Sequence, residues 1–282
     1  MTEWHQRYGG PGVMIYWHVE RRSTCIYSQL KNCSSSEVAA MIEGLLRHCT
    51  DAEIEANYVD THGASVVGFA FTELLGFRLL PRLKNIGSIR LYRPDDTDAY
   101  GQLGDVLTRP IRWELIAQQY DQMVKYATAL RLRTAESESI LRRFTRAATH
   151  PTYQAMLEVG RAQKTIFLCR YLRDRDLQRE INSGLNLAES WNRANAEIFY
   201  GKARDIASNR RDEQEMSVLC LHILQAAMVY VNTLVLQDVL AEDEWSQLLT
   251  SEDYRGLTPL TWAHVAIYLD SETFRVTADS GA

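Results

Sequence analysis

Two carboxylates far apart in the chain have positions that suit phosphoryl-transfer chemistry. Asp60 follows a short run, 54–58, in which apolar and polar residues alternate as they do in a strand. Glu189 stands near the start of a helical pattern that begins at Leu187. Acidic side chains from separate elements can hold two Mg²⁺ ions, one activating an attacking oxygen and one stabilising a leaving oxygen. Because Mg²⁺ prefers hard oxygen ligands, Asp60 and Glu189 are candidate metal ligands.

Each acid also has a purely structural interpretation. Asp60, like Thr61 and Ser65, suits the N-cap of the helix expected downstream, because side-chain oxygens accept hydrogen bonds from unpaired backbone N–H groups. Glu189 is four residues before Arg193, and such a pair on a helix surface has small energetic value. The residue types and their spacing leave both interpretations open.

The elements that would position these acids fall into an α/β part and a helical part. Up to Arg93 the order is strand, strand, helix, strand, helix, strand, which predicts a mixed sheet with helices on its faces. Asp60 would then lie at the carboxyl end of a strand, where open α/β sheets bind ligands. A polar loop is expected to run to Pro110. Strands are expected at 13–19, 24–30, 54–58 and 77–83, and later helices at 113–130, 135–145, 151–173, 176–182, 187–202 and 213–240.

The first helix has its apolar stripe over 38–46. Ser34, with Glu37 three residues later, has the spacing of a capping box. The sequence therefore predicts that this helix starts on Ser34.

The charge distribution limits how the chain can meet nucleic acid. The 282 residues are 46% hydrophobic and 24% charged, with a formal net charge of −5. Any DNA contact must therefore come from local basic patches. The run 77–94 holds five basic residues and no acid, and the run 161–179 is mostly basic. Taken alone, either run is better explained as a solvated face than as a DNA contact.

A membrane location is not expected. The longest apolar run, 218–240, has the length of a membrane span, but His222, Gln225 and Asn232 interrupt it along one helical stripe. This pattern predicts a buried helix with a polar seam. The five cysteines show no C-x-x-C spacing and no signal segment opens the chain, so we expect reduced thiols and a cytoplasmic protein.

Short motifs spread over nearly the whole chain match one family in type and in order. They are Gly-Val-Met-Ile-Tyr-Trp-His-Val-Glu at 12–20, Tyr-Val-Asp-Thr-His-Gly at 58–63, Pro-Arg-Leu-Lys-Asn-Ile-Gly at 81–87, Arg-Leu-Tyr at 90–92, Lys-Thr-Ile-Phe at 164–167, Gly-Leu-Asn at 184–186 before Glu189, and Thr-Pro-Leu at 258–260. The chain resembles, from about Trp4 to Val265, the carboxyl-terminal part of the Tn-three family of replicative transposases, which are of the DDE type.

The resemblance implies a function and a set of site residues. It implies that Asp60 is the second and Glu189 the third acid of the DDE set, and that both bind Mg²⁺ or Mn²⁺. It implies cleavage of transposon 3′ ends at terminal inverted repeats and strand transfer to target DNA. The implied DNA-contacting residues are His62, Arg82, Lys84, Arg90 and Arg193.

The resemblance also implies a fold class and its divisions. The expected class is α/β, a partial RNase H-like mixed sheet with a large, mostly helical insertion and a helical C-terminal part. The partial RNase H-like core would cover 1–93 and the helical insertion 94–184. The segment 185–282 would supply the completing helices of the catalytic domain and a frayed tail.

The first acid of the family set has no counterpart in this sequence. In the family it lies upstream of the strand placed here at Val13, and no aspartate precedes Asp51. The missing strand would join the hairpin to the 54–58 strand, so we expect these two parts to separate. Such a chain is expected to be inactive or nearly so alone. The alternative is an inactive remnant that binds DNA or an intact transposase; a homodimer is a further possible partner.

Overall fold

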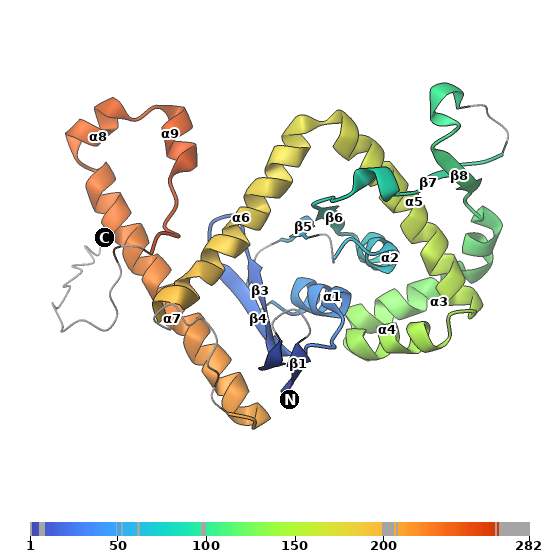
Figure 1. Ribbon diagram of the computed structural model, residues 1–282, viewed down its shortest axis with the longest axis horizontal. Helices are drawn as coiled ribbons and strands as arrows, with labels where there is room; N and C mark the ends of the chain where they lie inside the picture. The colour runs from blue at the N-terminus through green and yellow to red at the C-terminus, as the bar shows by residue number, and fades with distance from the viewer. Residues whose placement is uncertain are drawn as a thin grey trace.

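The computed structural model describes residues 2–5, 9–48, 50–51, 53–60, 63–96, 100–198, 206, 208–262 and 264. The fold is mixed α/β and mostly helical (Figure 1). The strands are β1 Glu3–His5, β2 Gly10–Gly12, β3 Met14–Val19, β4 Cys25–Lys31, β5 Ala56–Val59, β6 Arg78–Pro81, β7 Leu91–Arg93 and β8 Leu107–Pro110. The helices are α1 Glu37–Arg47, α2 Val66–Leu75, α3 Trp113–Arg131, α4 Ser137–Arg146, α5 Pro151–Arg173, α6 Arg175–Ile198, α7 Arg211–Leu240, α8 Asp243–Leu248 and α9 Ser251–Gly256, with 3₁₀ turns η1 Ile86–Ser88 and η2 Gly101–Leu103.

The described strands form two-stranded sheets instead of one mixed sheet. The pairs β1–β2 and β3–β4 are antiparallel, and β5–β6 and β7–β8 are parallel. The hairpin β3–β4 is not hydrogen-bonded to β5 within the described residues. The expected separation of these two parts is therefore confirmed.

Both faces of the β3–β4 hairpin are covered, because successive side chains of a strand point to opposite faces. His18 of β3 lies against Gly44 of α1, where an added Cβ would be 1.9 Å from the His18 ring. On the other face, the ring of Trp17 is 6.3 Å from that of Trp191 in α6. Ser28 of β4 is hydrogen-bonded to His222 of α7 on this second face, at 3.0 Å. The hairpin thus connects α1 to α6 and α7.

The His18 imidazole is held neutral inside this packing. Gln29 donates from Nε2 to His18 Nε2 at 3.0 Å and to the Ala40 carbonyl at 2.7 Å. Because it accepts this bond, Nε2 carries no proton. Burial lowers the pKa of His18 from 6.5 to about 4.

We expect acid to destabilise the fold through His18. Between pH 6.5 and 4 the unfolded chain binds a proton at this residue that the folded chain does not, so stability falls as pH falls through that window. A pKa shift of this size lowers the free energy of unfolding by roughly 3 kcal/mol once pH is below 4. Denaturant unfolding at a series of pH values measures it. The His18→Gln variant should lose this part of the slope, and an unchanged slope would contradict the assignment.

The main core lies between α1, α2 and the helices α3, α4 and α5. Met41, Phe71, Met123 and Met156 are fully buried in it. Helices α2 and α5 approach closely at Gly160, where a Cβ would lie 1.8 Å from the carbonyl oxygen of Val66. Only glycine permits this approach, so α5 is set directly against the start of α2 (Figure 1).

Helix α6 corrects one sequence prediction. Separate helices were expected at 176–182 and 187–202, but α6 is continuous from Arg175 to Ile198. A Cβ at Gly184 would lie 2.6 Å from the ring of Tyr58, so the absent side chain lets the helix cross β5. Tyr58 also donates from its hydroxyl to Glu180, one turn earlier, at 2.6 Å. These contacts offset the roughly 1 kcal/mol that glycine costs inside a helix.

Two further local predictions are wrong. The N-cap of α1 is Ser36, whose Oγ accepts from the Ala39 N–H, because the Ser34 N–H donates to Glu3 of β1 instead. The polar loop expected from Arg93 to Pro110 contains η2 and β8, and β8 pairs with β7 just before the loop. Strand β7 is tied to α5 by the bond from the Tyr92 N–H to Thr165 Oγ1 at 3.2 Å. Both errors come from partners that are distant in sequence.

Helix α7 has a polar seam and an apolar outer face. The predicted seam is confirmed: Gln225 and Asn232 are buried, and Asn232 donates to the carbonyls of Pro259 and Thr261. The prediction that this helix is buried is wrong, because Ile223 and Tyr230 on its outer face are 70% and 61% exposed. By length and composition alone, α7 is the one helix in the described part of the chain that could cross a membrane.

Candidate phosphoryl-transfer site

The carboxyl ends of β5 and β6 bring Asp60 and Arg82 together. Because the strands are parallel and in register, Val59 pairs with Pro81, and the next residues are neighbours. The Arg82 N–H donates to the Val59 carbonyl at 2.9 Å. Asp60 is exposed at this edge, and the placement expected for it is confirmed.

Helix α6 brings Glu189 to the same edge. After crossing β5 at Gly184, the helix continues for just over one turn to Glu189. Arg82 Nη2 lies 3.9 Å from Glu189 Oε1, and the Glu189 side chain is 57% exposed. Asp60, Arg82 and Glu189, which are far apart in sequence, therefore share one end of the β5–β6 pair.

Among the described residues, another side chain caps α2 and Glu189 pairs with a residue of another element. The N-cap of α2 is Ser65, whose Oγ accepts from the Gly68 N–H at 2.9 Å, so Asp60 does not cap this helix. The ion pair of Glu189 described by the structure is with Arg82 on another element, and Arg193 is exposed on α6.

Two residues of the sequence motifs, Tyr16 and Lys164, had no predicted site role but interact with Asp60 or with the segment after it. Burial raises the pKa of Tyr16 in β3, with the charges of Glu37 and Asp60 adding to the effect, so its hydroxyl stays protonated. Lys164 of α5 donates to the carbonyl of Ala64, four residues after Asp60, at 3.3 Å. Burial lowers the pKa of Lys164. The motif positions were the only signal, because neither residue is close to Asp60 in sequence.

Three of the remaining predicted DNA contacts are exposed side chains. Lys84 is exposed after β6, Arg90 is exposed before β7, and Arg193 is exposed on α6. His62 lies outside the described residues. Their role in DNA binding stays a prediction.

The donor set suits magnesium bound partly by substrate. No group of three or more His, Cys, Asp or Glu side chains that could hold a metal is found among the described residues. Mg²⁺ is commonly held by one or two carboxylates together with substrate phosphates and water. Asp60 and Glu189 match that mode, because both are accessible and the 3.9 Å contact with Arg82 is long for an ion pair.

A cavity of about 440 Å³ separates the two parts of the α/β region. One side is lined by Tyr16, Trp17 and His18 of β3, and the other by Ala56, Asn57 and Tyr58 of β5. Helix α6 contributes Gly184 to the lining. Because neither β3 nor β5 pairs with a strand on this side within the described residues, the cavity lies between two open strand edges.

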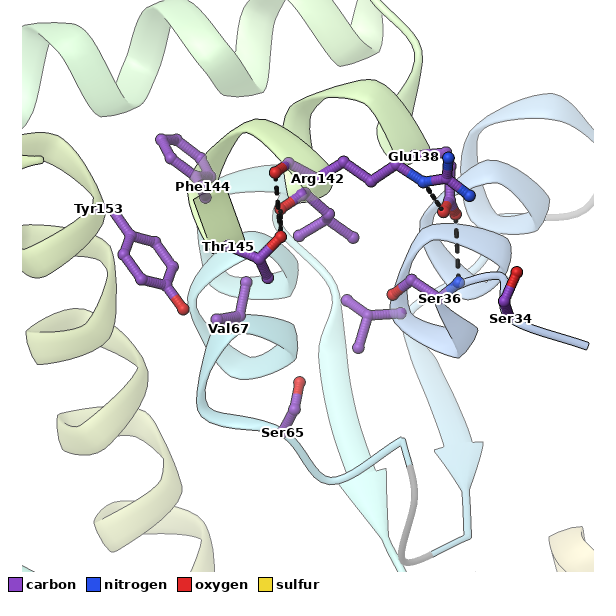
Figure 2. A pocket seen from close by; sticks show the side chains of 11 residues that line it. Ser34, Ser36, Ser65, Val67, Glu138, Arg142, Phe144, Thr145 and Tyr153 are labelled. Atoms are coloured by element: carbon purple, nitrogen blue, oxygen red, sulfur yellow. Dashed lines mark hydrogen bonds and ion pairs between the residues drawn. The ribbon is translucent and has the colours of Figure 1, made fainter. Parts of the chain in front are cut away.

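A second cavity, of about 340 Å³, lies between α1, α2, α4 and α5 (Figure 2). Its rim is closed by Glu138, which accepts from the Ser36 N–H at 3.2 Å and from Arg142 at 2.9 Å. Val67 and Phe144 line its interior (Figure 2). Neither Asp60 nor Glu189 lines it, so this cavity is separate from the candidate site.

Comparison with known proteins supplies a family for this geometry. Residues 1–268 match the family model described as "Tn3 transposase DDE domain". The chain is 28% identical over 257 residues, 91% of its length, to the transposase for transposon Tn1546 of Enterococcus faecium. It is 27% identical over 282 residues, 98% of its length, to the transposase for transposon gamma-delta of Escherichia coli. The matches cover 26% and 28% of these relatives, so the chain spans about a quarter of their length.

Proposed function

Because the chain belongs to the family of Tn3 transposase DDE domains, we propose that it supplies part of a catalytic centre for DNA transposition in the cytoplasm. The reaction would cut the 3′ ends of a transposon at its terminal inverted repeats and join them to target DNA. The family is one of DNA transposition and of DDE enzymes, which typically depend on divalent metal. That this chain takes part in the whole reaction is our proposal.

The observation that carries the proposal is that Asp60 and Glu189 lie at the same end of the β5–β6 pair as Arg82. Two accessible carboxylates at one strand edge would hold Mg²⁺ or Mn²⁺. A bound metal would activate the attacking oxygen and stabilise the leaving oxygen. The Arg82 guanidinium, with five N–H donors, would bind and orient the phosphate, and Lys84 would add positive charge nearby. The protonated Tyr16 would place no second negative charge beside Asp60.

The order of elements supports an RNase H-like interpretation. The hairpin β3–β4 is followed by α1, β5, α2 and β6, with the acid Asp60 after β5. We assign 1–93 to the partial core, 94–184 to the helical insertion and 185–282 to the part that carries Glu189. In this arrangement the cavity between β3 and β5 is the position for a strand carrying the remaining acid.

A second candidate function follows from the same cavity. Open edges of β3 and β5 present unpaired backbone groups to an added strand. The chain would then act as a binding protein that pairs with an intact transposase, or with a second copy, without catalysing the reaction itself.

Radical mapping of the metal position tests the catalytic proposal without requiring activity. Fe²⁺ in place of Mg²⁺, with ascorbate and peroxide, cleaves the backbone close to the bound ion. We expect cuts close to both residue 60 and residue 189, which excess Mg²⁺ suppresses. Asp60→Asn should weaken both sets of cuts, and the control Asp176→Asn on the same helix as Glu189 should weaken neither. Cuts confined to other segments would refute the shared metal site.

A further inference from the structure

Glu158 of α5 is a fully buried carboxylate surrounded by arginines. Its side chain has 0% exposure. It accepts from Arg109 Nη2 at 2.6 Å, from Arg112 Nε at 3.0 Å and from Arg161 Nη1 at 2.7 Å. A buried charge requires such partners, because its desolvation is otherwise very costly. One acid thus holds arginines from β8, from the start of α3 and from α5.

The cluster carries more positive charge than Glu158 neutralises. Within the described residues, the ion pairs of Arg109, Arg112 and Arg161 are all with Glu158, so three cations meet one anion. The Arg109 and Arg112 side chains remain 41% and 50% exposed. Each guanidinium has five N–H donors, and the bonds to Glu158 occupy only some of them. The outer surface of the cluster is therefore positive and rich in hydrogen-bond donors.

The arginines are held in place before any ligand arrives. The guanidinium carbons of Arg109 and Arg161 lie 5.4 and 5.6 Å from the centre of the Tyr92 ring. The Ile111 N–H donates to the Arg93 carbonyl at 2.9 Å, which fixes the backbone just before Arg112 against β7. Arginines fixed in this way lose little conformational entropy on binding, and their planar donors match phosphate oxygens.

The cluster lies along α5 from the candidate catalytic site. Lys164, which is bonded to Ala64 just beyond Asp60, is six residues after Glu158 on the same helix. Six residues of α-helix correspond to roughly 9 Å. The arginine cluster and the segment that follows Asp60 are therefore both attached to α5, through Arg161 and Lys164.

We propose that Glu158 organises Arg109, Arg112 and Arg161 into a binding site for the phosphate backbone of DNA. The proposal rests on the proposed function and extends it by naming a phosphate-binding site outside the predicted contacts. The site recognises phosphates, so it would hold DNA irrespective of base sequence.

The test measures how salt weakens binding of the full chain to a short labelled duplex. We expect Arg112→Gln to lower the slope of log affinity against log salt by about 0.9, the value for one phosphate contact. If the two proteins bind equally at 1 M salt, this difference in slope makes the affinity of the variant about eightfold lower than that of wild type at 0.1 M salt. Arg112→Lys should keep most of the slope, and the control Arg179→Gln, on an exposed arginine paired with Asp176, should keep all of it.

The outcomes separate this site from the function it rests on. Failure of the wild-type chain to bind duplex even at low salt would refute DNA binding altogether. Normal binding with an unchanged slope in Arg112→Gln would refute this site alone. If Arg112→Gln does not fold, phenylglyoxal modification of the wild-type chain decides: DNA should protect Arg109 and Arg112 but not Arg179, and equal reactivity with and without DNA would overturn the proposal.

Discussion

Replacing Asp60 with asparagine is expected to lower the rate of Mg²⁺-dependent strand transfer by about a thousandfold or more. The change keeps the size of the side chain and removes the negative charge at the end of β5. Loss of a metal ligand removes several kcal/mol of transition-state stabilisation, and each 1.36 kcal/mol is a factor of ten in rate. Glu189→Gln should have a similar effect, because its carboxylate lies at the same edge beside Arg82.

The assay must supply the parts of a transposase that the chain does not share with its relatives. We would replace the matching segment of the gamma-delta transposase with residues 1–268 and measure joining of 3′ ends from a terminal-inverted-repeat duplex. Glu180→Gln is the matched control, since Glu180 is on α6 but is bonded to Tyr58 away from the site. Robust strand transfer that survives Asp60→Asn would reject the catalytic assignment.

Replacing Glu158 with alanine is expected to destabilise the fold by about 3–5 kcal/mol, the usual cost of removing one partner from a buried charge network. The variant would leave three guanidinium groups close together without their shared anion. Because the arginines come from β8, α3 and α5, the loss should loosen the attachment of β7–β8 and α3 to α5. Urea unfolding followed by circular dichroism measures the change.

Two comparisons test whether the buried network around Glu158 causes the expected loss of stability. Asp176→Ala removes an exposed acid paired with Arg179 and should change stability little. Burial opposes ionisation of Glu158, but hydrogen bonds from Arg109 and Arg112 outweigh it, so the pKa of Glu158 is below its usual 4.5. Its stabilising contribution is thus present above pH 4.5 and is lost as pH falls below. A Glu158→Ala chain as stable as wild type at pH 7 would show that the network does not support the fold.

Structural features that depend on nearby residues in the chain were predicted well. Helix α5 was expected at 151–173 and is found at Pro151–Arg173, because its apolar spacing and the proline at its start act within the segment itself. The position of Asp60 at a strand end was likewise readable, since alternation before it and helical spacing after it define the turn. The polar seam of α7 was predicted from His222, Gln225 and Asn232 on one stripe.

Structural features that depend on contacts between residues far apart in the chain were predicted poorly. The helix break expected near Gly184 is absent, and α6 is continuous there. Gly184 is glycine because the ring of Tyr58 occupies the space that a side chain would need. The capping role expected for Ser34 belongs to Ser36, because Glu3 binds the Ser34 N–H. Glu158 received no role at all, because two of its three arginines are more than forty residues away in the chain.

The sequence by itself determined the order of the elements from β3 to β6, the acidic residue types and their placement at a strand end and on a helix, since hydrophobic period and turn residues are local properties. Only the tertiary structure decided that Arg82 lies beside both Asp60 and Glu189, and that one buried carboxylate gathers three arginines. Those contacts depend on α5 crossing α2 and on α6 crossing β5. The crossings are set by close approaches at Gly160 and Gly184 that no local pattern encodes.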